Sequence, residues 1–60
     1  MKVTEYDTGN GVDKFILDDK VTYVYDMGAG FSISYPLYKL LLNAYKNNEE
    51  VTNEKIAENI

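Results

Sequence analysis

The chain has 60 residues, among them ten carboxylates, six lysines and six tyrosines, and its formal net charge is −4. It contains no His, Cys, Trp or Arg. These absences exclude a disulfide framework and a zinc site built from Cys and His, and they remove the usual neutral-pH proton shuttle. They also argue against direct binding to nucleic acid, which needs clustered Lys and Arg.

Residues 1–35 are expected to form strands separated by turns. Asn10-Gly11 is the strongest turn signal, because a type I′ hairpin turn needs positive φ at both central residues. A two-residue loop at this position pairs Asp7 with Lys14, Tyr6 with Phe15, Glu5 with Ile16 and Thr4 with Leu17.

A second turn is predicted at Asp18-Asp19-Lys20, where two registers compete. A three-residue loop pairs Leu17 with Val21, whereas a two-residue loop moves every side chain of the third strand to the other face. We prefer the three-residue loop because it gathers one set of large apolar side chains on one face: Phe15, Leu17, Val21, Tyr23 and Tyr25.

A fourth strand is predicted after the glycine-rich break at Met27-Gly28-Ala29-Gly30. The segment from Phe31 to Tyr35 alternates apolar and polar residues with a period of two, which is typical of a half-buried strand. We therefore expect Phe31, Ile33 and Tyr35 to face inward.

An amphipathic helix is predicted over residues 36–48. Proline disfavours helical geometry in the preceding residue and fits the first helical turn, so Tyr35-Pro36 marks the change from strand to helix. The helical spacing is carried by Leu37, Leu40, Leu41, Ala44 and Tyr45. Tyr38 and Leu42 widen the apolar arc to roughly 200°, about twice what packing on one sheet requires. A second cover is therefore expected over Tyr38, Leu42 and Tyr45, either the C-terminal segment or a second copy of the chain.

A short helix is predicted over residues 52–60, because Thr52 is a good N-cap and Val51 and Ile56 have the spacing of a hydrophobic staple. The chain is thus expected to be a single domain, residues 1–60, of the α+β class. Its predicted architecture is a small three- or four-stranded antiparallel sheet in 1–35, one amphipathic helix packed on one face, and a short C-terminal helix.

The sheet face opposite the predicted core carries the candidate binding residues. In the preferred register this face holds the acidic residues Glu5, Asp7, Asp18 and Asp26, with Lys14 as the main opposing charge. Val3, Ile16, Thr22 and Val24 are expected among them. Such a face suits a partner protein with a basic, partly apolar surface, although an ordinary solvated sheet face has the same pattern.

No constellation in the sequence predicts catalysis, a cofactor or a metal. Gly28-Ala29-Gly30 lacks the Lys and Ser/Thr of a phosphate-binding loop, and a 60-residue domain rarely forms the partly dry pocket that carboxylate catalysis needs. No apolar run is long enough to span a membrane. The chain is therefore interpreted as a non-enzymatic, cytoplasmic protein that binds another protein.

The composition, rich in Asn, Lys, Tyr and Ile, is similar to that of small accessory proteins from AT-rich bacterial or phage genomes. We expect a phage- or mobile-element-type inhibitor that blocks a basic surface of a host protein, such as a nucleic-acid-binding surface, by mimicking the charge of DNA. The alternative is a self-assembling structural protein that acts as a homodimer through Tyr38, Leu42 and Tyr45.

Overall fold

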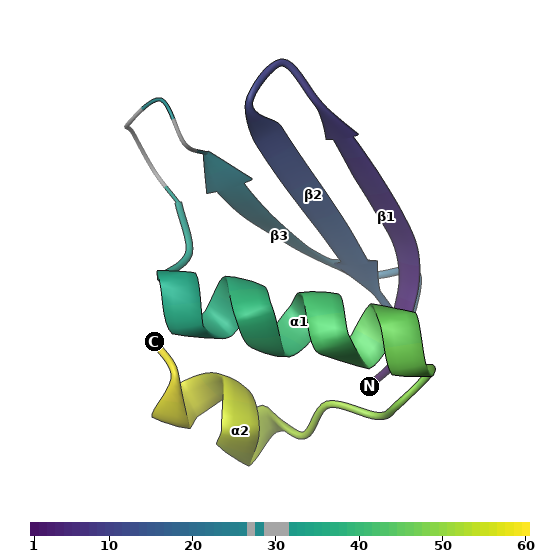
Figure 1. Cartoon of the computed structure of the whole chain (residues 1–60). Helices are drawn as coiled ribbons and strands as arrows, with labels where there is room; N and C mark the ends of the chain where they lie inside the picture. The colour runs from purple at the N-terminus through teal and green to yellow at the C-terminus, as the bar shows by residue number, and fades with distance from the viewer. Residues whose placement is uncertain (27, 29–31) are drawn as a thin grey trace.

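The computed structural model describes residues 1–26, 28 and 32–60. Within these residues it contains the strands β1 (Val3–Gly9), β2 (Val12–Leu17) and β3 (Val21–Asp26) and the helices α1 (Tyr35–Asn47) and α2 (Asn53–Glu58). The strands form an antiparallel sheet in the order β1-β2-β3, and α1 crosses one face of it with α2 beside α1 (Figure 1). The predicted α+β class is confirmed.

The β1–β2 hairpin has the predicted turn and most of the predicted register. Asn10 and Gly11 have φ values of 55° and 77°, as a type I′ turn requires. The pairs from Glu5–Ile16 to Gly9–Val12 are those expected from a two-residue loop.

The predicted pair between Thr4 and Leu17 is wrong, because a bulge shifts the register and pairs Val3 with Leu17. The Thr4 hydroxyl donates to the carbonyl of Ile16 at 3.1 Å and accepts from the Asp19 N–H at 3.1 Å. These bonds tie Thr4 to the next turn. The bulge also moves Val3 from the acidic face, where it was expected, into contact with the core.

The three-residue loop between β2 and β3 is confirmed, since Leu17 pairs with Val21 and Phe15 pairs with Tyr23. The apolar face of the sheet therefore meets α1 as predicted. The resulting core consists of Phe15, Leu17, Leu37, Leu41, Ala44, Val51 and Ile56, all buried.

The fourth strand predicted from Phe31 to Tyr35 is wrong for the described residues of that segment. Ser32 to Ser34 are irregular and Tyr35 begins α1, whereas Phe31 and most of the predicted break at 27–30 lie outside the described residues. The Ser34 hydroxyl accepts from the Leu37 N–H at 3.3 Å and so caps the helix. As a result Tyr35 is 56% exposed instead of inward, while Ile33 packs against the core as expected.

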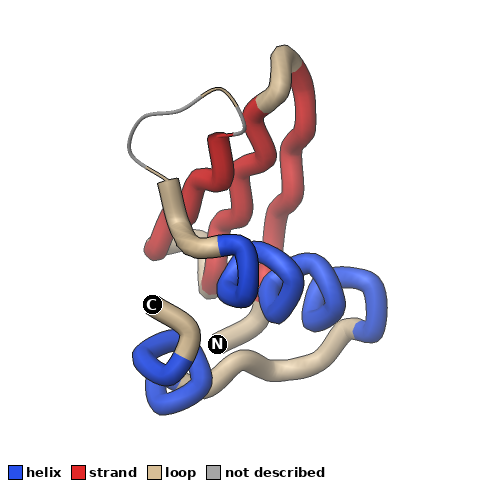
Figure 2. Tube along the Cα trace, turned by 60° about the vertical axis from the view of Figure 1, so that its left-hand side comes forward, coloured by secondary structure: helices blue, strands red, loops and turns tan. Residues whose placement is uncertain are grey.

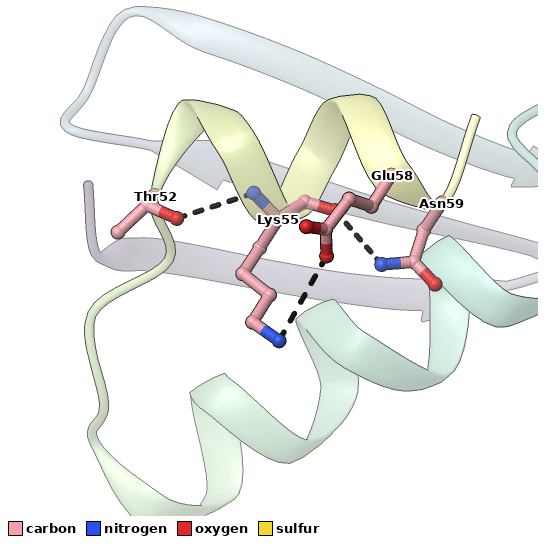
Figure 3. Close-up of polar contacts among 4 residues, drawn as sticks. All are labelled: Thr52, Lys55, Glu58 and Asn59. Carbon is pink, nitrogen blue, oxygen red and sulfur yellow. Dashed lines mark hydrogen bonds and ion pairs between the residues drawn. The ribbon is translucent and has the colours of Figure 1, made fainter.

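The C-terminal segment docks on the core through Val51 and Ile56, which confirms the predicted short helix. Figure 3 shows the Thr52 hydroxyl accepting from the Lys55 N–H at 3.2 Å and the Asn59 side chain donating to the Lys55 carbonyl at 2.8 Å. The ion pair of Lys55 with Glu58, 3.9 Å apart, is exposed and contributes little.

Both chain ends hold this segment against the rest of the molecule. The Met1 ammonium donates to the Val51 carbonyl at 2.6 Å, and the Val51 N–H donates to the Met1 carbonyl at 2.6 Å. At the other end the Ser34 hydroxyl donates to the carbonyl of Asn59. A helix as short as α2 is unstable in isolation, so these contacts and its buried Ile56 are what keep it folded.

Candidate functional site

The sheet face that points away from α1 is called here the outer face. Strand alternation and the observed register place eight side chains on it: Glu5, Asp7, Val12, Lys14, Ile16, Thr22, Val24 and Asp26. Figures 1 and 2 show both helices on the opposite side of the strands, with the β1–β2 hairpin extending beyond α1. No described helix or strand covers the outer face.

Two of the four predicted acidic residues lie together on the outer face. Glu5 and Asp7 are both exposed and alternate along β1, which places their Cα atoms about 6.6 Å apart. Lys14 lies opposite Asp7 on β2 and is also exposed. Since β1 is at the edge of the sheet, these two carboxylates form an acidic border along one side of it.

The other two predicted acidic residues are placed differently. Asp26 is at the far end of β3, and its carboxylate accepts from the Gly28 N–H at 2.8 Å. Asp18 lies in the turn after β2, where its carboxylate accepts from the Lys2 N–H at 3.0 Å. Asp18 is therefore not brought together with Glu5 and Asp7, and its side chain has a structural role in holding the N-terminal residues.

The centre of the outer face is apolar. Ile16 and Val24 lie on the central strand and on β3, and both are half-buried although neither belongs to the core described above. Val12, near the hairpin, is half-buried as well. The outer face thus combines an apolar centre with an acidic border on β1, whereas the sequence analysis expected four acidic residues interspersed among the apolar ones.

The inner face contains a buried carboxylate that the sequence reasoning missed. Asp13 is only 3% exposed, and it accepts hydrogen bonds from the Thr8 hydroxyl at 2.5 Å and the Tyr6 hydroxyl at 3.2 Å. Its spacing could have predicted this burial, because Asp13, Phe15 and Leu17 are two residues apart along β2 and therefore face the same side of the sheet.

These hydroxyl donors stabilise the charged form of Asp13. Its pKa is held below the ordinary value of 3.8, first by the hydrogen bond from Thr8, against the opposing effect of burial. The hydrogen bond of the Tyr38 hydroxyl to this carboxylate raises the pKa of Tyr38 to about 12. Burial and then the charge of Asp13 raise the pKa of Tyr6. The described residues place no lysine within ion-pair range of Asp13, so hydroxyl groups alone compensate its burial.

Five of the six tyrosines and Phe15 form a continuous aromatic row between α1 and the sheet. Successive rings, with centroids 4.3–6.2 Å apart, belong to Tyr35, Tyr25, Tyr38, Phe15, Tyr6 and Tyr45. Tyr38 is packed inside this row against the sheet itself, so the expectation that the C-terminal segment or a second copy covers it is wrong for this residue. Leu42 is half-buried against the core, and Tyr45 remains 44% exposed beside Tyr6.

Residues 1–26, 28 and 32–60 form no pocket, and they contain no cluster of acidic side chains suited to a metal ion. None of the helices in this part of the chain has the length and apolar character needed to cross a membrane. The chain matches no protein-family model, no curated protein and no solved structure.

Proposed function

We propose that the chain is a small non-enzymatic module that binds another protein through the outer face of its sheet. The observation that carries this proposal is the uncovered sheet face, in which half-buried Ile16 and Val24 are bordered by Glu5 and Asp7. Apolar side chains at the centre supply buried area, and charged side chains at the border select the partner. The matching surface is apolar at its centre and basic at its border.

The proposed consequence of binding is inhibition by occlusion. A partner whose basic surface is covered by this module cannot present it to another anion, and a nucleic acid is the commonest ligand of such a surface. The proposal includes a cytoplasmic setting and a phage- or mobile-element-type role. Since Asp18 lies away from Glu5 and Asp7, mimicry of a regular phosphate row has less support than a compact contact.

Self-assembly through Tyr38, Leu42 and Tyr45 is the weaker alternative. Tyr38 contacts Tyr25 and Phe15 within its own chain, and this leaves Tyr45 as the most exposed side chain of the three. A contact through Leu42 and Tyr45 alone is small. The outer face, by contrast, has three half-buried apolar side chains (Val12, Ile16 and Val24) over which no described helix or strand lies.

The experiment compares three immobilised forms of the chain in a lysate of the cells that produce it. The first is the wild type, and the second carries Asp7→Lys with Asp26→Lys on the outer face. The third, a control of the same net charge, carries Glu49→Lys with Glu54→Lys on exposed residues near α2. Retained proteins are identified by mass spectrometry at about 0.1 M and about 1 M salt, between which the Debye length falls from about 10 Å to about 3 Å.

The proposal expects a basic protein that the wild type and the control retain at low salt and that the outer-face variant loses. Added DNA should displace it if the covered surface binds nucleic acid. Equal retention by all three forms, or loss by both variants alike, contradicts the proposal, because binding then does not depend on the outer face.

A further inference from the structure

The outward edge of β1 has backbone groups that the chain itself does not use. On β3, the Val24 carbonyl accepts from the Ile33 N–H at 2.9 Å and the Asp26 N–H donates to the Ser32 hydroxyl at 3.0 Å. The backbone groups of Val24 and Asp26 therefore point away from β2. This observation fixes the direction of every backbone group in the sheet, because the directions alternate along each antiparallel strand.

On the central strand, Lys14 lies opposite Val24, so its backbone groups point the other way and bond to Asp7 on β1. It follows that Tyr6 and Thr8, the neighbours of Asp7, direct their N–H and C=O groups out of the sheet. Within residues 1–26, 28 and 32–60 these groups have no hydrogen-bond partner. They are a template on which a further strand can pair.

Other parts of the sheet border are already occupied by the chain. Ser32 and Ile33 bond to the end of β3, as described above. The start of the N-terminal segment is covered too, since Lys2 forms an antiparallel bridge with Glu50. The open stretch of β1 is thus short and lies beside Glu5 and Asp7.

The charges beside this edge distinguish between two candidate strands. In a second copy of the chain, antiparallel pairing about Tyr6 places Glu5 directly opposite the partner's Asp7, and like charges at opposite positions are destabilising. A strand with Lys or Arg at these positions gains two opposite-charge pairs. Charge complementarity therefore favours a basic segment of a different protein.

The position opposite Tyr6 faces the other side of the sheet, where Tyr45 from α1 lies with its ring centroid 5.2 Å from that of Tyr6. The Tyr45 side chain is 44% exposed there. An apolar side chain on an added strand at this position packs against the exposed ring. The edge thus selects a basic–apolar–basic triplet in extended conformation.

We propose that β1 binds an extended segment of the partner protein as a fourth strand, with basic side chains beside Glu5 and Asp7 and an apolar side chain between them against Tyr45. This inference rests on the proposed function and specifies how the partner is bound. Backbone pairing supplies affinity in this mode of recognition, and alternate side chains supply specificity.

The test uses blocked six-residue peptides that alternate Lys and Val, followed by amide NMR spectra of the labelled chain. The first peptide is unmodified, the second is N-methylated at its Val residues, and the third is N-methylated at its Lys residues. In the proposed pairing the Val amides point toward β1 and the Lys amides point away. A fourth peptide has Glu in place of Lys. The chain is tested as wild type, as Glu5→Lys with Asp7→Lys, and as the control of equal charge, Glu49→Lys with Glu54→Lys.

We expect the unmodified and Lys-methylated peptides to bind, with increased exchange protection of the Tyr6 and Thr8 amides, and the Val-methylated and Glu peptides to fail. The double variant on β1 should weaken binding about tenfold or more, whereas Glu49→Lys with Glu54→Lys, outside the sheet, should weaken it less than about twofold.

Equal binding of the two methylated peptides, or an equal effect of Glu49→Lys with Glu54→Lys, overturns pairing at β1 but leaves docking on the outer face intact. Failure of the unmodified peptide also overturns this inference. The lysate experiment then decides independently whether the outer face binds a protein.

Discussion

The rings of Tyr25 on β3 and Tyr38 on α1 stack with their centroids 4.3 Å apart and their planes inclined by 17°. Tyr38 also contacts Phe15 edge-on, and the buried Asp13 carboxylate acts on its hydroxyl strongly enough to raise the pKa of Tyr38 to about 12. The ring of this one helix side chain therefore contacts both β2 and β3, and its hydroxyl interacts with Asp13 on β2. Tyr38 holds α1 in place over the sheet.

Separate substitutions should resolve the two roles of Tyr38. Tyr38→Phe keeps the stacked ring and removes the hydroxyl, so we expect a loss of about 1–2 kcal/mol in the free energy of unfolding. Tyr38→Ala also removes the ring and should cost about 3–5 kcal/mol, which equals most of the stability of a domain of this size. Urea unfolding followed by circular dichroism measures both. Equal losses for the two variants would show that the ring contributes nothing.

At alkaline pH the raised pKa of Tyr38 should become visible. The folded state retains the hydroxyl proton up to a pKa of about 12, whereas the unfolded chain loses it near the ordinary value of 10. The folded state thus binds more protons between these values, and stability falls as the pH rises through this interval. The stability difference between wild type and Tyr38→Phe should be full below pH 10 and shrink above it. Tyr35→Phe, at an exposed ring, is the control for loss of a tyrosine hydroxyl and should change the free energy of unfolding at pH 7 by less than about 0.5 kcal/mol.

The lowered pKa of Asp13 should make stability depend on pH in the opposite direction, with a loss as the pH falls. The folded state holds the carboxylate charged below its ordinary pKa of 3.8, so this contribution is complete above that value and is lost as the pH falls through the lowered pKa. Asp13→Asn should cost about 1–3 kcal/mol at pH 7, and its difference from wild type should shrink in acid. Unfolding by urea at a series of pH values tests this. Asp7→Asn, at an exposed carboxylate, should change stability by less than about 0.5 kcal/mol at pH 7.

The elements that the sequence predicted correctly are those with a local physical cause. Asn10-Gly11 satisfies the positive φ values of its turn without help from the rest of the chain, and Thr52 caps the helix that directly follows it. The pairing of Phe15 with Tyr23 follows from loop length and the gathering of apolar side chains. Each of these depends on neighbours within a few residues.

The elements that were missed depend on contacts over a longer range or on competing local signals. The alternation from Phe31 to Tyr35 indicated a strand, but the Ser34 cap and Pro36 favour a helix start, and the helix prevailed. The bulge at Thr4 depends on a bond to Asp19, 15 residues away. Asp13 was missed because a carboxylate is ordinarily exposed, and the hydroxyls that hydrogen-bond to it belong to Tyr6 and Thr8 on the neighbouring strand β1.

The turn between β2 and β3 offers a stabilising substitution. Asp19 has a φ of 56°, a left-handed conformation that costs most residues energy but that glycine adopts freely. The described residues give its carboxylate no hydrogen-bond partner. Asp19→Gly should therefore raise the free energy of unfolding by up to about 1 kcal/mol, and Asp19→Val should lower it by about 1 kcal/mol or more. Thermal unfolding ranks the three proteins, and the reverse order contradicts the argument from backbone strain.

The acidic border of β1 should also determine whether the chain pairs with itself. In antiparallel pairing of two copies about Tyr6, residue 5 of each copy lies opposite Asp7 of the other. Glu5→Lys therefore converts two repulsive charge pairs into two attractive ones. We expect this variant to dimerise at concentrations where the wild type has its monomer mass of 6.9 kDa.

The double variant Glu5→Lys with Asp7→Lys restores like charges at these positions and should return to the monomer. Asp26→Lys changes the charge by the same amount as Glu5→Lys but on β3, so it should leave the mass unchanged. Sedimentation measures all four masses at one concentration. A wild-type dimer that Leu42→Asp with Tyr45→Asp dissociates would instead support self-assembly through α1, and a monomeric Glu5→Lys variant would show that the edge of β1 does not accept a strand in this register.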